Sequence, residues 1–194
     1  MLPVIAMDAS LSVSDITFVA FDFETTGLHP ATDRIIELGA VKFQDRAVLG
    51  TFDMLVNPGI PMTDAAANVS GITAEMLASK PAIEQALPDF MEFISGAVLV
   101  AHNAPFDMSF LRAALEIAGM GDVPNVVIDT QVLAQKAYPR LRSYSLQNLV
   151  SELDLTRGNA HRALDDAVMC KDLFLTCAEA LSFMGEITLG EVLT

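Results

Sequence analysis

Basic residues, cysteines and long apolar runs are all scarce in this chain of 194 residues. The longest apolar runs are short, such as AVLVA at 97–101, whereas a helix that spans a bilayer needs roughly 18–20 apolar residues. The start of the chain, MLPVIAMDAS, lacks a basic residue and a long apolar stretch, so no secretory signal is predicted. We therefore expect a cytoplasmic protein without a membrane partner.

The two cysteines, Cys170 and Cys177, lie seven residues apart in a segment with helical periodicity. Seven helical residues rise about 10 Å, which is too far for a disulfide within one straight helix. The sequence has no histidine or second cysteine pair around them, so a zinc site is not predicted either. We expect two small buried side chains.

The chain has 11 basic and 25 acidic residues, which gives a net charge of −14. Proteins that coat long nucleic acids bind them through many Lys and Arg contacts to phosphate, so this class is excluded. The charge is also uneven. Residues 136–162 hold five basic and two acidic residues, a local balance of +3, which leaves −17 for the rest.

Apolar residues make up 52% of the chain and charged residues 19%, a composition typical of a folded protein. The length fits one domain with a sizeable core. Short apolar runs bounded by turn residues predict five strands, and helical periodicity predicts the intervening helices. The strands are predicted at 16–23, 34–44, 48–56, 97–101 and 125–129. The helices are predicted as short pieces within 63–79 and then at 81–95, 105–118, 130–137, 145–153 and 162–183.

The first three predicted strands follow one another closely enough to form an antiparallel meander, and the later strands alternate with helices. This order of elements predicts an α/β fold, with a mixed sheet covered by helices on both faces.

Two acidic residues stand on an otherwise apolar strand in the segment FDFETTG at 21–27. Asp22 and Glu24 share one face of the strand because they are two positions apart, while Phe21 and Phe23 share the other. Two neighbouring carboxylates repel each other and are costly to remove from water. A hard cation such as Mg²⁺ or Mn²⁺ relieves both costs because it prefers oxygen ligands. The alternative is that this strand end has one face exposed to solvent and binds no metal.

The segment HNAPFD at 102–107 lies where a predicted strand ends and a helix begins. Sites tend to form at such strand ends when helices cover the sheet. Asp107 falls in the first helical turn, where the helix dipole favours a carboxylate even without a metal.

The segment HRALDDA at 161–167 carries a histidine and two further acids. Residues five apart in one helix are separated by about 140° around its axis. His161 and Asp166 therefore converge only if His161 lies at or before the helix start, and Asp165 then points away to the surface. A capping or exposed histidine is the alternative.

Together these segments place four carboxylates and one imidazole at the ends of elements. The set fits phosphodiester hydrolysis in which two cations about 4 Å apart activate a water and stabilise the leaving oxygen. Histidine is the side chain that most often takes up such a proton near neutral pH.

The three segments resemble the signatures of the DEDD exonucleases of the histidine subclass, whose type member is the proofreading epsilon subunit of bacterial replicative DNA polymerase. Lesser similarities are RIIELGAV at 34–41, LVNPG at 55–59, SGIT at 70–73 and SYSLQNL at 143–149. The resemblance covers roughly 16–180. It implies a ribonuclease H-like fold of five strands in the order 3-2-1-4-5. We expect a leader at 1–14, an exonuclease domain at 15–184 and a short tail at 185–194.

The resemblance implies a 3′→5′ exonuclease that releases 5′-nucleoside monophosphates. Two divalent cations, Mg²⁺ or Mn²⁺, would be held by Asp22, Glu24, Asp107 and Asp166, with Asp22 bridging both. His161 would be the general base and not a ligand.

The partner would be a nucleic-acid 3′ end, single-stranded or frayed. In the family the segment after the first motif holds the terminal nucleotide. By this resemblance, the backbone at Thr25 meets the 3′-hydroxyl and Leu28 wedges against the last base. Further substrate contacts are expected from Thr26, Gly27, His102, Asn103, Phe106, Arg140 and Arg142. For the two arginines, which lie in the basic segment, a solvated loop is the alternative.

The epsilon subunit has a C-terminal extension that docks on its polymerase, whereas about ten residues, GEITLGEVLT, follow the last predicted helix here. A stand-alone enzyme, or a polymerase subunit that uses another surface, is therefore expected. A homodimer also remains open, because related enzymes that degrade RNA usually dimerise. DNA is the favoured substrate and an RNA-trimming or oligoribonucleotide-degrading activity is the runner-up, since that choice depends on contacts near the 2′-position.

Two further alternatives have less support. Asp22-Phe23-Glu24-Thr25 faintly resembles the nucleophile motif of haloacid-dehalogenase-like phosphatases, and Asp165-Asp166 their late acidic pair. That hypothesis needs an aspartate where Glu24 stands and gives Asp107 and His161 no role. A non-catalytic nucleic-acid-binding module would be expected to have lost one of the five residues, and all five are present.

Overall fold

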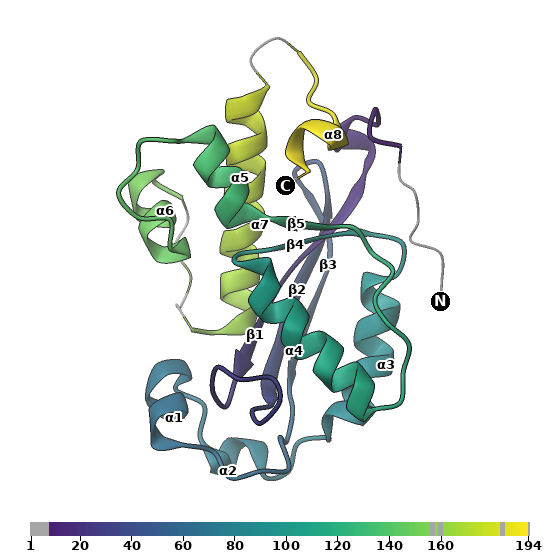
Figure 1. The fold of residues 1–194 in the computed structure, drawn as a ribbon, viewed down its shortest axis with the longest axis vertical. Coiled ribbons are helices and arrows are strands. Elements are labelled where there is room, and N and C mark those ends of the chain that lie inside the picture. Colours follow the sequence, from purple (N-terminus) through teal and green to yellow (C-terminus); the bar gives the residue numbers. More distant parts are fainter. Residues whose placement is uncertain (1–7, 156–157, 159–160, 183–184, 194) are drawn as a thin grey trace.

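Five strands form one sheet in the order β3-β2-β1-β4-β5 in the computed structural model of the chain (Figure 1). The structure describes residues 8–155, 158, 161–182 and 185–193. The central strand β1 runs antiparallel to β2 and parallel to β4, and β3 and β5 form the edges. The predicted mixed sheet and its order are confirmed. The strands are β1 (Thr17–Thr25), β2 (Ile35–Gln44), β3 (Ala47–Leu55), β4 (Val98–Ala101) and β5 (Val127–Asp129).

The helices follow the predicted pattern, with one start shifted by two residues and three others by one. Helix α3 begins at Ile83 and not at 81. Ala82 is the N-cap residue with an extended backbone, and its N–H donates to Gln85 Oε1 at 3.1 Å. Within the described residues, no helix is both long and apolar enough to cross a membrane. The helices are α1 (Asp64–Ser70), α2 (Ala74–Leu77), α3 (Ile83–Ile94), α4 (Ala104–Ile117), α5 (Thr130–Ala137), α6 (Leu146–Glu152), α7 (Ala163–Leu181) and α8 (Leu189–Val192).

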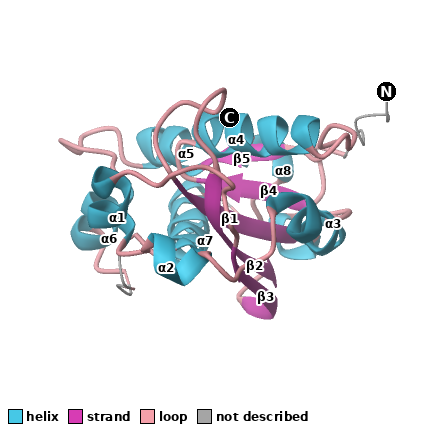
Figure 2. Cartoon of the chain, turned by 90° about the horizontal axis from the view of Figure 1, so that it is seen from below, coloured by secondary structure: helices cyan, strands magenta, loops and turns pink. Residues whose placement is uncertain are grey.

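Helices cover both faces of the sheet, as Figure 2 shows from one end. Alternate residues of β1 supply two separate cores. Phe18 and Ala20 pack in the core formed with α5, α6 and α7, which also buries the free thiols of Cys170 and Cys177 as predicted. Phe21 and Phe23 pack in the core formed with α3 and α4. The even-numbered positions of β1 therefore face α7, and this alternation directs Asp22 and Glu24 to that side.

The segments predicted as leader and tail contact each other. The Val13 N–H donates to the Ile187 carbonyl at 2.9 Å, and both Val13 and Leu189 are buried in the α7-side core. A 3-10 turn at Val13–Asp15 and helix α8 were not predicted. The division of the chain at 14 and 184 stays a prediction, and these contacts attach both segments to the same core.

Candidate active site

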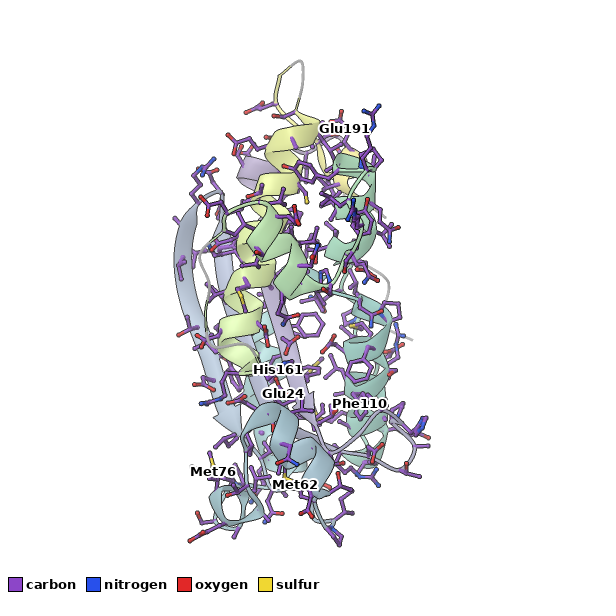
Figure 3. All side chains as sticks on the ribbon, turned by 90° about the vertical axis from the view of Figure 1, so that its left-hand side faces the viewer. Glu24, Met62, Met76, Phe110, His161 and Glu191 are labelled. Carbon is purple, nitrogen blue, oxygen red and sulfur yellow. The ribbon has the colours of Figure 1, made fainter. Side chains whose placement is uncertain are left out.

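The predicted acidic residues come from three elements that meet at the carboxyl end of β1. Asp22 and Glu24 lie on β1, Asp107 lies in the first turn of α4, and Asp166 lies in the first turn of α7. His161 precedes α7, whose first residue is Ala163. Figure 3 shows Glu24 close to His161 below the start of α7.

A cleft of about 320 Å³ opens over these groups and is lined by Asp22, Glu24, His161 and Asp166. One potential ligand atom from each of Glu24, His161 and Asp166 lies within 4.8 Å of the others. Among the described residues this is the group of acids and imidazole that could hold a metal ion. Asp165 lies outside the cleft lining and is half-buried.

Asp107 lies behind the cleft and is 3% exposed. Its Oδ1 accepts the backbone N–H of Phe23 at 3.1 Å. Phe23 stands between Asp22 and Glu24 on β1, so this bond joins the first turn of α4 to the acidic part of the strand. The contact spans 84 positions of sequence and brings the second motif to the first.

His161 adopts a left-handed backbone conformation with φ of 66°. Its N–H donates to Asp166 Oδ2 at 2.8 Å, so the loop folds back over the first turn of α7. This conformation lets two residues five apart converge. The expected position of His161 before the helix is confirmed.

Burial is the main cause of raised pKa values in all four carboxyl groups. The pKa of Asp22 lies well above its ordinary value, because Asp107 and Asp166 add their charges to the effect of burial. The pKa of Glu24 is raised to about 7 and that of Asp107 to about 8. The metal-free site therefore retains protons near neutral pH, and a bound cation would favour their release.

His102 lines the same cleft, but both of its ring nitrogens have protein partners. Nδ1 lies 2.9 Å from Thr130 Oγ1, and Nε2 lies 2.9 Å from the Tyr144 carbonyl. Burial lowers the pKa of His102, which favours a neutral ring that donates through Nε2 and accepts at Nδ1. His102 thus joins the end of β4 to the loop before α6.

Asn103 is exposed in the cleft and has a left-handed backbone with φ of 59°. Its N–H donates to Asp129 Oδ1 at 3.0 Å, so the backbone is fixed by β5 while the amide side chain faces the cleft.

A second, more apolar cleft of about 390 Å³ adjoins the first through Phe23 and Glu24. The predicted nucleotide-binding residues Thr25, Thr26, Gly27, Leu28 and Phe106 line one part of it. The opposite wall is α1, which Figure 1 shows at this end of the molecule. The residues of that wall were not predicted and are Thr63, Ala66 and Val69.

The loop between β1 and β2 is held by its own hydrogen bonds. The Thr26 N–H donates to the Arg34 carbonyl at 2.9 Å, and the Arg34 N–H donates to Thr26 Oγ1 at 3.0 Å. A side chain at Gly27 would place Cβ 2.5 Å from Asp33 Oδ2, so any other residue here would displace the Asp33 carboxylate from its bond to the His29 N–H. Leu28 projects from this fixed loop with 74% of its surface exposed.

Arg140 and Arg142 are exposed on the loop between α5 and α6 and line neither cleft. The loop is anchored at Tyr144, whose carbonyl accepts from His102 and from Gln131 Nε2 at 3.2 Å. Gln147, just beyond it, donates through Nε2 to Asp166 Oδ1 at 3.4 Å. The basic loop is thus tied to the acidic cleft, although its two arginines stand outside the cleft lining.

An ion pair beside the site was not predicted from the sequence. Arg162 Nη2 lies 2.7 Å from Oε1 of Glu37 on β2, and the Glu37 side chain is fully buried. Glu37 belongs to the segment RIIELGAV and Arg162 to HRALDDA, so the resemblance marked both segments but gave neither residue a role.

The sheet has the strand order of a ribonuclease H-like fold, and the acidic cleft lies at the carboxyl end of its central strand. The chain belongs to the RNase_T exonuclease family, which matches residues 19–174. The predicted membership of an exonuclease family is confirmed, and the match contradicts the phosphatase hypothesis.

Relatives and solved structures agree with this family. The DNA polymerase III subunit epsilon of Treponema pallidum is 43% identical over 163 residues, which are 83% of this chain and 76% of that protein. The DNA polymerase III PolC-type of Caldanaerobacter subterraneus is 38% identical over 191 residues, which are 98% of this chain but only 14% of that much longer protein. The structure of exonuclease X in complex with 5′ overhanging duplex DNA is 26% identical, with a TM-score of 0.70, and covers 91% of this chain and 98% of its own.

Proposed function

We propose that the chain is a metal-dependent 3′→5′ exonuclease that hydrolyses the terminal phosphodiester bond of DNA and releases 5′-nucleoside monophosphates. The observation that carries the proposal is the cluster of Glu24, His161 and Asp166 in the open cleft. Asp22 lines the same cleft, and Asp107 is bonded to the backbone of the strand that carries Asp22 and Glu24. The family match and the exonuclease X structure support the reaction class.

The donor set fits divalent cations. Asp22, Glu24, Asp107 and Asp166 offer carboxylate oxygen alone, which suits Mg²⁺ or Mn²⁺. Their pKa values are raised mainly by burial and further by neighbouring negative charges, which bound cations would compensate. Two such ions would polarise the scissile phosphate and acidify the attacking water.

His161 is positioned to take the proton of the attacking water. Its ring reaches the cleft near Glu24 and Asp166, while its backbone N–H is held by Asp166. This bond limits the movement of the loop. Orientation of a base in this way lowers the entropic cost of the reaction.

The apolar cleft is suited to hold the terminal nucleotide. The hydroxyl of Thr25 donates to the Gly27 carbonyl at 2.6 Å, which fixes the backbone that would meet the 3′-hydroxyl. Leu28 and the α1 residue Val69, which is 58% exposed, offer apolar surfaces on which a base can stack. The cleft adjoins Glu24, so a nucleotide held there has its phosphate at the carboxylates.

DNA is the favoured substrate because the relatives carry the names DNA polymerase III PolC-type and DNA polymerase III subunit epsilon, and the exonuclease X structure holds duplex DNA. These names also support a role in proofreading beside a DNA polymerase. An RNA-trimming activity is the second candidate, since no described contact selects for or against a 2′-hydroxyl. A homodimer is an alternative assembly, and light scattering of the purified chain would distinguish it from a monomer.

The direct test supplies the protein with single-stranded DNA, mismatched duplex DNA and short RNA, each with Mg²⁺ and with Mn²⁺. Chromatography of the products should show deoxynucleoside 5′-monophosphates released first from the 3′ end, and EDTA should stop the reaction. Release from the 5′ end, or no release from any substrate by a folded protein, would refute the proposal.

A further inference from the structure

A buried carboxylate lies beneath the first turn of α7, and the proposed chemistry does not use it. Glu37 on β2 is 0% exposed. Arg162 donates to it through Nη2 at 2.7 Å and through Nε at 3.1 Å, and the Ala163 N–H donates to Oε2 at 2.9 Å. Both carboxylate oxygens are therefore occupied by the residues that begin α7.

The same face of β2 touches the backbone of α7 directly. Gly39 is two positions from Glu37, so both residues share that face. A Cβ at Gly39 would lie 2.1 Å from the Ala163 carbonyl carbon and 2.2 Å from the Leu164 nitrogen. Only a residue without a side chain permits this approach. Glu37 and Gly39 together fix both the position and the direction of the helix start.

The residues fixed in this way flank the catalytic groups. Arg162 directly follows His161, and Asp166 lies one turn into α7. Glu37 in turn is paired in register with Glu24 on β1. The chain of contacts therefore runs from the strand that carries two proposed metal ligands, through its neighbour β2, to the loop that carries the proposed base and another ligand.

We propose that Glu37 is a positioning residue that acts through Arg162 and Ala163 to hold His161 and Asp166 against the carboxylates of β1. The inference rests on the proposed nuclease function. A buried ion pair adds little stability over apolar residues of the same volume, because removing both charges from water is costly. The Arg162 side chain is 43% exposed. Its guanidinium group therefore donates two hydrogen bonds to the buried carboxylate while part of the group stays in contact with water.

The experiment compares Glu37→Gln and Arg162→Lys with the matched control Glu179→Gln. Glu179 also lies on α7 and is also paired with an arginine, Arg46, but that pair is about 70% exposed. Glu37→Gln removes the charge of the acceptor. Arg162→Lys keeps the positive charge but loses the paired N–H donors of the guanidinium group. Two readouts are taken: kcat and KM on single-stranded DNA with Mn²⁺, and amide hydrogen exchange in the metal-free protein.

We expect kcat to fall at least tenfold in both variants, while KM changes less than twofold, because the terminal nucleotide binds in the other cleft. Exchange at the amides of His161 and Ala163 should be at least tenfold faster. The control should change neither readout. A purely structural role would lower the melting temperature but leave kcat of the folded protein unchanged, and that result would overturn the proposal.

Two outcomes keep the test decisive. If Glu37→Gln does not fold, Arg162→Lys, which alters a half-exposed side chain, decides alone, and an unchanged kcat overturns the proposal. If the wild-type protein degrades no substrate, the nuclease function fails separately. The exchange rates then decide whether Glu37 holds the loop, and unchanged rates at His161 and Ala163 overturn that role as well.

Discussion

Asp107 accepts a hydrogen bond from the backbone N–H of Phe23 at 3.1 Å. Phe23 is flanked by Asp22 and Glu24, so this single bond brings a third carboxylate to the two on β1 at a fixed position. The bond uses the backbone, which substitution of neighbouring side chains does not remove. The hydrogen bond from Phe23 favours the ionised form of Asp107. Burial opposes ionisation more strongly, so the pKa of Asp107 is raised to about 8.

Asp107→Asn separates the metal-binding role of this residue from its structural role. The amide oxygen can still accept from Phe23, whereas the buried negative charge is lost. We expect the metal-free variant to be more stable than the wild type at pH 9, by a few kcal/mol at most, since one pKa unit corresponds to about 1.4 kcal/mol. Thermal unfolding with and without Mn²⁺ measures this. The variant should also lose most of the stabilisation by Mn²⁺, and wild-type stabilisation would contradict the assignment of Asp107 as a ligand.

The stability of the metal-free protein should fall as the pH rises from about 5 to about 8.5. Glu24 and Asp107 have folded-state pKa values of about 7 and about 8, above their ordinary values of 4.5 and 3.8. The folded state therefore binds more protons than the unfolded state in this range, and its stability is lost as the pH passes through the folded values. Urea unfolding at a series of pH values checks the sign. Saturating Mn²⁺ should reduce or reverse the slope, because the metal requires the ionised groups.

His161→Ala should lower kcat by about 10²–10⁴, the usual contribution of a general base. The four carboxylates remain, so Mn²⁺ binding measured by calorimetry should change little. His161→Gln serves as the control for volume and should be equally slow, because an amide does not take up a proton. Full activity in either variant would remove the base assignment.

Arg140→Ala combined with Arg142→Ala tests whether the basic loop contacts the substrate backbone. If each arginine contacts one phosphate, the plot of log affinity against log salt should become less steep by about 1.4 for single strands. Arg46→Ala combined with Arg112→Ala removes the same charge from exposed arginines elsewhere and should leave the slope unchanged. Equal slopes in the wild type and in both double variants would show that the basic loop is exposed to solvent and does not contact the substrate backbone.

Leu28→Ala should raise KM severalfold, because each CH₂ group of the side chain that a bound base buries contributes about 0.8 kcal/mol. Val69→Ala removes the opposite wall and should act in the same direction. Leu49 is 55% exposed on β3 and lines neither cleft, so Leu49→Ala is the matched control. Steady-state kinetics on oligonucleotides with each terminal base measure the effect, and an unchanged KM in both cleft variants would place the nucleotide elsewhere.

Local patterns predicted the parts of the fold that depend on nearby residues. The alternation in β1 indicated which face carries Asp22 and Glu24, and the geometry of a helix indicated that His161 must precede α7. The order of the strands and the roles of the residues came from the resemblance, because sequence spacing alone does not show which strands become neighbours.

The contacts that the sequence analysis missed join residues far apart in the chain. Glu37 and Arg162 are separated by 125 positions, and their pairing depends on the register of β2 and the direction of α7. Likewise, His102 was predicted to contact substrate, and only the structure shows both of its ring nitrogens bonded to protein. The sequence did not indicate that Val69 lines a cleft, because the rest of that cleft comes from the distant loop after β1.

Anomalous diffraction from a crystal soaked in Mn²⁺ would locate the proposed metal ions. We expect manganese peaks within coordination distance of Asp22, Glu24, Asp107 and Asp166, with the His161 ring close by but unbound. Crystals of the folded protein with saturating Mn²⁺ and no peak among these carboxylates would contradict the proposed metal site.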